Sequence, residues 1–136
     1  VGIEVNVVTP PWEEYIQDTY LGEYDILIGG WIADIPDPDN FFFPLLSKTS
    51  VRKKGTGNSA FYDNDEMHRL LLKAKATTKT EERDQLYKNA CQLFQRDLPW
   101  LTIAHAQIVI PRRREVMNFN PYASYSRNLK SVWIKS

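Results

Sequence analysis

The chain has 136 residues, of which 43 % are hydrophobic, 12 % aromatic and 25 % charged. This composition supports one packed domain and disfavours disorder. Lys plus Arg (17) balances Asp plus Glu (17), so bulk charge does not indicate binding to nucleic acid or to an anionic membrane. No apolar run approaches the roughly 18 residues of a membrane-spanning helix. The single cysteine, Cys91, excludes an internal disulfide and a multi-cysteine zinc site.

The first thirty residues predict a strand, a helix and a second strand. Apolar and polar residues alternate along residues 1–8, the period of a half-buried strand. A large apolar residue recurs every fourth position across residues 12–20, up to a stop at Gly22, which is typical of a short amphipathic helix. Residues 24–31 are mostly apolar and end in glycines, as in a strand buried on both faces of a parallel sheet.

These elements together form a βαβ unit, whose crossover is right-handed in nearly all proteins. The sequence therefore predicts an α/β domain, with Ile26 and Ile28 buried in an interior strand. A strand-like pattern at the very first residue indicates a piece of a longer protein. Absent targeting signals then carry no information about location.

The second half of the chain predicts two helices after an irregular stretch at residues 34–62. Asp63 and Glu66 form a capping-box-like start to the first helix, and Thr80 caps the second, which ends before Pro99. Residues 100–110 and 132–134 read as strands. The positions expected to be buried on the two helices are Met67, Leu70, Leu71, Ala74, Leu86, Ala90, Leu93 and Phe94.

The residues that could carry catalysis or bind a metal are sparse. His68 and His105 have no cysteine or carboxylate at ligand spacing, so we predict no metal site. Cys91 lies beside the apolar stripe of the second helix and is expected to be a buried, unreactive thiol. We therefore predict a protein that is not an enzyme and that carries no cofactor.

Residues 29–41 form the densest cluster of distinctive residues, directly after a predicted buried strand, where open α/β sheets place their ligands. Its glycines allow close approach of another backbone, Trp31 offers a large apolar surface, and Asp34 offers a charge. The same stretch also fits a loop made rigid by prolines, with aspartates capping its turns. Spacing alone leaves both interpretations open.

The run from Tyr24 to Phe41, YDILIGGWIADIPDPDNF, resembles a signature segment of family 5 extracytoplasmic solute-binding proteins, the oligopeptide-, dipeptide- and nickel-binding components of ABC importers. Further similarity lies in Asn58 to Glu66, which resembles the family's N-x-x-x-Y-x-N-x-E motif. The segment from Glu82 to Trp100 is similar to its ER…LY…D-x-P-W helix, and Val132-Trp133 resembles its closing strand. The resemblance covers essentially the whole chain.

This resemblance implies part of the C-terminal lobe of a two-lobed, type II periplasmic-binding-protein-like fold that closes over its ligand. Residues 1–116 would belong to that lobe, and residues 117–136 would return towards the N-terminal lobe. The protein would be periplasmic or lipid-anchored outside the cytoplasmic membrane. It would capture peptides and deliver them to ABC transporter permease subunits.

The resemblance also implies the ligand contacts. Asp34 would pair with the α-amino group of a peptide, Trp31 would line a side-chain pocket, and the Gly30 backbone would bond the extended peptide; Ile32 completes the predicted set. Ile35 departs from the family, which more often has an aromatic residue there. Because other members bind nickel complexes, haem or sugars, the motif does not fix the ligand.

One alternative function and one prediction about the surface accompany this interpretation. The alternative function is a ligand-sensing domain of the same fold in a cytoplasmic transcriptional regulator, which a helix-turn-helix elsewhere in the protein would support. A lobe without its partner should also expose apolar surface around Phe119, Tyr122 and Trp133, and should therefore tend to self-associate.

Overall fold

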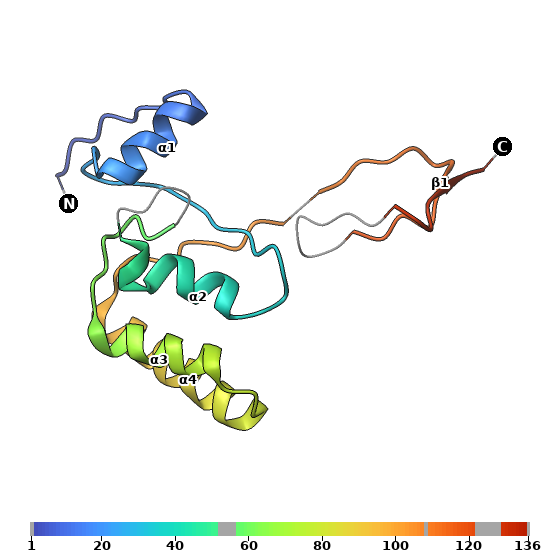
Figure 1. Ribbon diagram of the computed structural model, residues 1–136. Helices are drawn as coiled ribbons and strands as arrows, with labels where there is room; N and C mark the ends of the chain where they lie inside the picture. Colours follow the sequence, from blue (N-terminus) through green and yellow to red (C-terminus); the bar gives the residue numbers. More distant parts are fainter. Residues whose placement is uncertain (1, 52–56, 108, 122–128, 136) are drawn as a thin grey trace.

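Helices carry most of the regular structure of the chain. The computed structural model describes residues 2–51, 57–107, 109–121 and 129–135 (Figure 1). The elements in chain order are α1 (Trp12–Leu21), α2 (Asp39–Leu46), the 3₁₀ helix η1 (Lys48–Ser50), α3 (Asp65–Ala76), α4 (Thr80–Asp97), β1 (Val116–Met117) and β2 (Trp133–Ile134).

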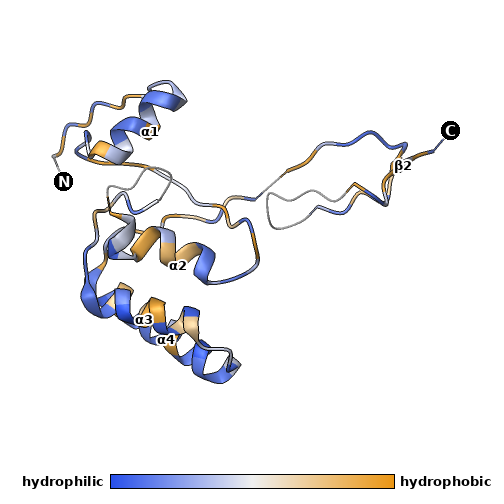
Figure 2. Ribbon diagram, in the orientation of Figure 1, coloured by the Kyte–Doolittle hydropathy of each residue, from blue (hydrophilic) through white to orange (hydrophobic). Residues whose placement is uncertain are grey.

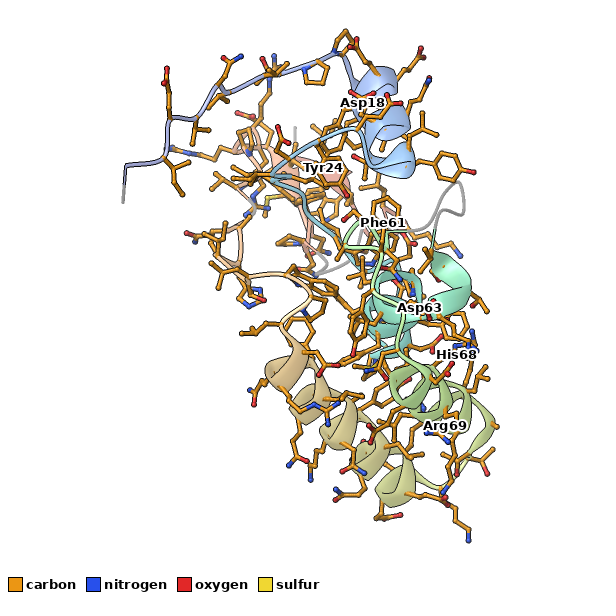
Figure 3. The ribbon with its side chains drawn as sticks, turned by 90° about the vertical axis from the view of Figure 1, so that its left-hand side faces the viewer. Asp18, Tyr24, Phe61, Asp63, His68 and Arg69 are labelled. Atoms are coloured by element: carbon orange, nitrogen blue, oxygen red, sulfur yellow. The ribbon has the colours of Figure 1, made fainter. Side chains whose placement is uncertain are left out.

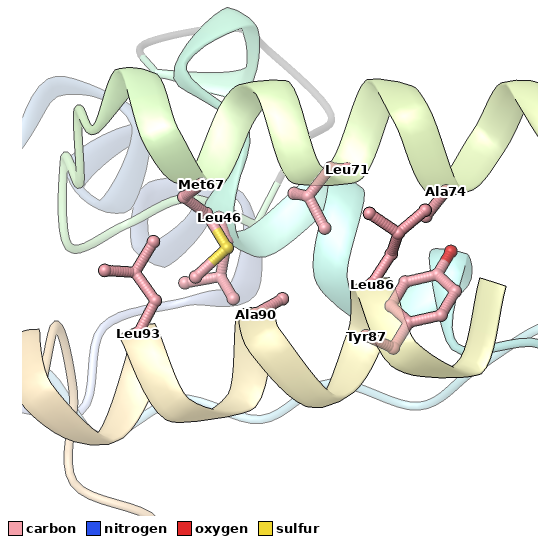
Figure 4. Packing of buried hydrophobic residues seen from close by; sticks show 8 residues of the cluster. All are labelled: Leu46, Met67, Leu71, Ala74, Leu86, Tyr87, Ala90 and Leu93. Carbon is pink, nitrogen blue, oxygen red and sulfur yellow. The ribbon is translucent and has the colours of Figure 1, made fainter. Parts of the chain in front are cut away.

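The hydrophobic core lies where α2 packs on the pair formed by α3 and α4 (Figure 4). Tyr87 joins the expected stripe, whereas Leu70 and Phe94 are only partly buried at its edge. The prediction of two amphipathic helices is confirmed because their apolar residues recur at the 3.6-residue period and face each other. The buried residues are Leu46, Met67, Leu71, Ala74, Leu86, Tyr87, Ala90 and Leu93.

Details at the ends and sides of these helices differ from the prediction. The side chain of Asn64, not Asp63, caps α3, accepting hydrogen bonds from the backbone N–H groups of residues 66 and 67. Thr80 is the first residue of α4 rather than its cap. Cys91 is exposed, which contradicts the predicted burial. It directly follows buried Ala90 and is therefore turned by about 100° away from the buried stripe.

Helix α2 forms inside the stretch that the sequence predicts to be irregular, and that prediction is wrong for residues 39–46. The misleading signal is Pro44, because proline lacks the N–H that an α-helix needs and normally breaks a helix interior. Burial of Leu46 and packing on α3 stabilise α2 despite this loss. Asp39 in the first turn contributes favourably through the helix dipole.

The strands predicted at residues 1–8, 24–31 and 100–110 are not present in the described parts of these ranges, which exclude Val1 and residue 108. Ile26 and Ile28 are 72 % and 79 % exposed, so the prediction of a buried interior strand is wrong for this structure. The segments run extended, and Figure 2 shows apolar residues on the segment before α1. A strand requires a neighbour for its backbone N–H and C=O groups, and these segments pair with none in the described chain.

The segment after α1 is attached to the loop that precedes α3. Gly22 ends α1 in the left-handed region, at φ 78°, as predicted for a helix stop. A Cβ at Gly22 would lie 2.7 Å from the Phe61 ring, so a side chain there would clash. The Tyr24 hydroxyl donates to the Ser59 carbonyl. Figure 3 shows Tyr24 and Phe61 on the side of the molecule where these segments meet.

The end of the chain forms a two-stranded antiparallel ladder, in which Val116 pairs with Ile134 and Met117 with Trp133. The prediction of a final strand at residues 132–134 is confirmed for Trp133 and Ile134. Figure 1 shows that this ladder projects away from the helices. Among the described residues, the helices are all too short or too polar to cross a membrane.

Candidate ligand-binding site

The predicted ligand contacts all lie on one extended segment that leads into α2. A Cβ placed on Gly30 would meet no other heavy atom within 4 Å, so its backbone faces open space. Ile32 is 47 % exposed, and Asp34 is also exposed. The structure therefore places Gly30, Ile32 and Asp34 where a ligand could reach them.

Trp31 is half-buried and is held by α2 on one side and by the backbone at Gly57 on another. Its indole Nε1 donates a hydrogen bond of 2.7 Å to the backbone carbonyl of Asn40, in the first turn of α2. Gly57 lies against the indole ring, because a Cβ there would be 2.9 Å from two ring carbons and would overlap the Leu45 side chain. The ring is thus fixed in place while part of it stays accessible.

The backbone of Asp34 is held by Asn40, the residue that also accepts the hydrogen bond from Trp31. The Asp34 N–H donates to the side-chain Oδ1 of Asn40 at 2.8 Å. Asn40 therefore contacts both Trp31 and Asp34, although the sequence offered no reason to single it out within the cluster at residues 29–41. The contacts of Asn40 could not be read from the sequence, because only the formation of α2 brings this residue opposite the segment that precedes it.

The loop between Asp34 and α2 is tied to α4 by an ion pair. Arg83 Nη2 lies 2.7 Å from Asp37 Oδ1, and Arg83 also donates to the Ala74 carbonyl and the Tyr87 hydroxyl. The hydrogen bond from Arg83, and a second from the backbone N–H of Asp39, lower the pKa of Asp37 below its ordinary value. The Asp37 carboxylate accepts the N–H of Asp39, the first residue of α2, and so places a negative charge beside the start of that helix.

The arrangement favours noncovalent binding of an extended, amine-bearing ligand. An exposed carboxylate pairs with a cation, an open glycine backbone can bond another backbone, and a fixed indole offers apolar contact. His68 is engaged elsewhere, with its Nδ1 3.0 Å from the Ser47 hydroxyl. Within the described ranges, no three His, Cys, Asp or Glu side chains gather to hold a metal ion.

Comparison of the sequence with known proteins finds relatives that bind small ligands. The chain is 38 % identical over 106 residues to "Heme-binding protein A" of Haemophilus influenzae, an alignment that covers 78 % of this chain and 19 % of that protein. It is 37 % identical over 123 residues to "Probable di/tripeptide-binding protein 5" of Pseudomonas aeruginosa, covering 89 % and 23 %. It is 34 % identical over 119 residues to the "Dipeptide-binding protein" of Escherichia coli, covering 88 % and 22 %. No protein-family model matches the chain.

Two solved structures match the fold of this chain. The "ABC transporter-associated periplasmic binding protein DppA" of Helicobacter pylori, in complex with peptide STSA, matches with a TM-score of 0.90 and 32 % identity over 99 % of this chain and 26 % of that one. The dipeptide-binding protein of Pseudoalteromonas sp. SM9913, in complex with Met-Leu, matches with a TM-score of 0.81 and 34 % identity over 98 % and 26 %.

These matches confirm the predicted fold class, an α/β fragment of a periplasmic-binding-protein lobe. The chain spans only about a quarter of the length of the proteins that it matches. The TM-score of 0.90 over nearly the whole chain means that the extended segments also follow a path found in a much longer protein. Their exposed side chains therefore lie along a backbone path that this longer protein shares.

Proposed function

Because the chain belongs to the family 5 extracytoplasmic solute-binding proteins and spans about a quarter of the length of the proteins that it matches, we propose that it is a ligand-contacting part of the substrate-binding component of an ABC importer. In this proposal, a peptide is captured between two lobes and passed to permease subunits in the membrane. The observation that carries the proposal is the exposed segment on which Gly30 is open, Trp31 is fixed and Asp34 is accessible.

Each predicted contact has a distinct chemical task. The Asp34 carboxylate pairs with the α-amino group of the peptide, and lobe closure strengthens this pair by removing water. The backbone of Gly30 bonds the backbone of the peptide, which permits binding regardless of side chains. Trp31 and Ile32 line the space for a peptide side chain. The protein binds and releases its ligand without chemical change.

The position of the chain in the whole protein is also part of the proposal. Residues 1–116 form part of the C-terminal lobe, and residues 117–136 return towards the N-terminal lobe. The extended segments before and after α1 are strands whose neighbours come from the rest of such a protein. This accounts for the exposure of Ile26 and Ile28. The location is periplasmic, with or without a lipid anchor.

The charge of the site favours a peptide over haem as the ligand. One relative is named as haem-binding, but the propionate groups of haem are anionic and would repel Asp34, whereas a peptide presents an ammonium group. The relatives named as peptide-binding proteins support import over the alternative of a cytoplasmic transcriptional regulator.

The experiment compares a tripeptide with a free amino group and its N-acetylated form by calorimetry, in the protein produced from its complete reading frame. Replacement of Asp34 by Asn should weaken binding of the free-amino peptide by roughly 2–4 kcal/mol, because an enclosed ammonium group loses its partner. Binding of the acetylated peptide should change little.

The matched control is Asp84→Asn, which removes the same charge from an exposed position on α4 and should leave both affinities unchanged. Equal weakening of both peptides by Asp34→Asn would make Asp34 structural and would reject its role as the amine partner. Tight binding of haem with no binding of either peptide would reject the peptide as ligand.

A further inference from the structure

We propose that Asn40 is the positioning residue of this site and that Pro44 leaves its backbone carbonyl open to receive Trp31. Asn40 contacts the site with two different groups. Its carbonyl accepts the Trp31 indole N–H at 2.7 Å, and its side-chain Oδ1 accepts the Asp34 backbone N–H at 2.8 Å. The inference rests on the proposed function, because it concerns how the two ligand contacts are held.

Pro44 explains why this carbonyl is open. In an α-helix the carbonyl of residue i accepts from the N–H of residue i+4, and the residue four positions after Asn40 is Pro44, which has no N–H. The Asn40 carbonyl inside α2 therefore loses its helical donor. Trp31 supplies a replacement donor from another segment, so the proline in α2 creates the acceptor that orients the indole.

The side-chain contact fixes the other ligand group relative to the first. Between Trp31 and Asp34 lie only two residues, and both ends of this span bond to the same residue on α2. Asn40 therefore sets how far the indole lies from the backbone of Asp34, from which the carboxylate extends. An extended peptide requires that spacing if its amino group and a side chain are to bind together.

Asn40 can act in this way because α2 is anchored to the core. Leu46 at the end of α2 is buried, and Asp37 just before α2 pairs with Arg83 of α4. Phe42 packs against Tyr87 at a ring-centroid distance of 5.4 Å. A site held by residues on a rigid element is more precisely placed than one held by its own loop.

The test uses Asn40→Ala in the protein from its complete reading frame, with the free-amino tripeptide Ala-Ala-Ala as probe. We expect hydrogen–deuterium exchange at the Asp34 amide to accelerate about tenfold or more, and affinity for the tripeptide to fall about tenfold, as for one lost hydrogen bond. Asn40→Asp keeps an oxygen acceptor and should restore protection of the Asp34 amide. Asn89→Ala on α4 is the matched control and should change neither quantity.

A second variant, Pro44→Ala, tests the carbonyl. It restores an N–H that competes with the Trp31 indole for the same acceptor, so the fluorine resonance of 5-fluorotryptophan at position 31, assigned through Trp31→Phe, should shift. The thermal midpoint should not fall, because a helix-breaking residue has been removed. Affinity should fall although stability does not, which a merely structural role would not produce.

The outcomes separate the two proposals. Weaker binding in Asp34→Asn together with unchanged affinity in Asn40→Ala and Pro44→Ala would overturn the positioning role while the proposed function stands. Unchanged affinity in Asp34→Asn, Asn40→Ala and Pro44→Ala alike would overturn the proposed function and, with it, the positioning role.

Discussion

The helical part and the extended part of this molecule respond differently to the same requirement, that backbone polar groups be bonded. A helix satisfies its own N–H and C=O groups, so α2, α3 and α4 form and enclose a core. The segments before and after α1 need neighbouring strands, and in the described chain they lie extended with exposed apolar side chains. Helices α2, α3 and α4 are therefore the part of the chain that encloses its own core, and we expect the extended segments to need neighbours from the rest of a longer protein.

The largest expected effect concerns the core of the helical part. Leu71→Ala removes a fully buried side chain from α3 and should lower the free energy of unfolding by about 2–5 kcal/mol. Leu72→Ala, one position along, alters a side chain that is 46 % exposed and should change it by less than about 0.5 kcal/mol. Denaturant unfolding of both variants measures the contrast; equal losses would contradict the core described here.

Ile26 extends the same contrast to the extended part. In the 136-residue chain Ile26→Ala should cost less than about 0.5 kcal/mol, since the side chain is exposed. In the protein from its complete reading frame the same change should cost about 2–4 kcal/mol if the segment is an interior strand. A small cost in both would mean that this segment is not a buried strand in the whole protein.

A smaller effect tests how the helical part supports the site. Gly57→Ala would place a methyl group against the Trp31 ring and the Leu45 side chain, and should cost about 1–3 kcal/mol through overpacking. Leu45 can rotate away, but the indole is held by Asn40. Ala60→Gly in the same loop, at an exposed position, serves as the control. Unchanged stability together with an unchanged Trp31 environment would show that the ring does not rest on Gly57.

The smallest effect concerns the ion pair between Asp37 and Arg83. Asp37→Asn should cost about 1 kcal/mol at pH 7, a value reduced because 27 % of the Arg83 side chain and 33 % of the Asp37 side chain are exposed. Since the folded-state pKa of Asp37 is lowered, its contribution is present above the unfolded value near 3.8 and is lost as pH falls through the folded value. Between pH 7 and pH 2, the thermal unfolding midpoints of the wild-type and Asp37→Asn proteins should converge. A constant difference between the two midpoints would show that the ionised carboxylate of Asp37 does not stabilise the fold.

Much of the helical part could be predicted from the sequence because its signals are local. The apolar stripes at Met67–Ala74 and Leu86–Leu93 have the helical period and need only each other to be buried. The run at residues 24–31 has an equally clear apolar pattern, but whether it forms a strand depends on partners that its own residues do not specify. Helix α2 escaped prediction because Pro44 is tolerated only through packing and the contact from Trp31.

The candidate site divides in the same way. Trp31 and Asp34 were recognisable because the resemblance of their segment to a known family implies a ligand contact for each, although spacing alone leaves a rigid loop as an equal interpretation. Asn40 was not, because its role depends on a carbonyl that becomes available only when α2 forms around Pro44. In our proposals, the residues that would touch a ligand carry chemistry that the sequence displays, whereas Asn40 acquires its positioning role from the fold.

We propose that this chain holds part of a site that another lobe completes. The most direct test titrates the 136-residue chain with the free-amino tripeptide by calorimetry while light scattering measures its mass. We predict binding in the millimolar range at best, about −4 kcal/mol, because the pair between the Asp34 carboxylate and the peptide's amino group stays open to water. Trp133, which is 50 % exposed, and Phe119, which is half-buried, should promote self-association through their accessible apolar surface. Tyr122 lies outside the described residues. Micromolar affinity in a strictly monomeric chain would contradict the claim.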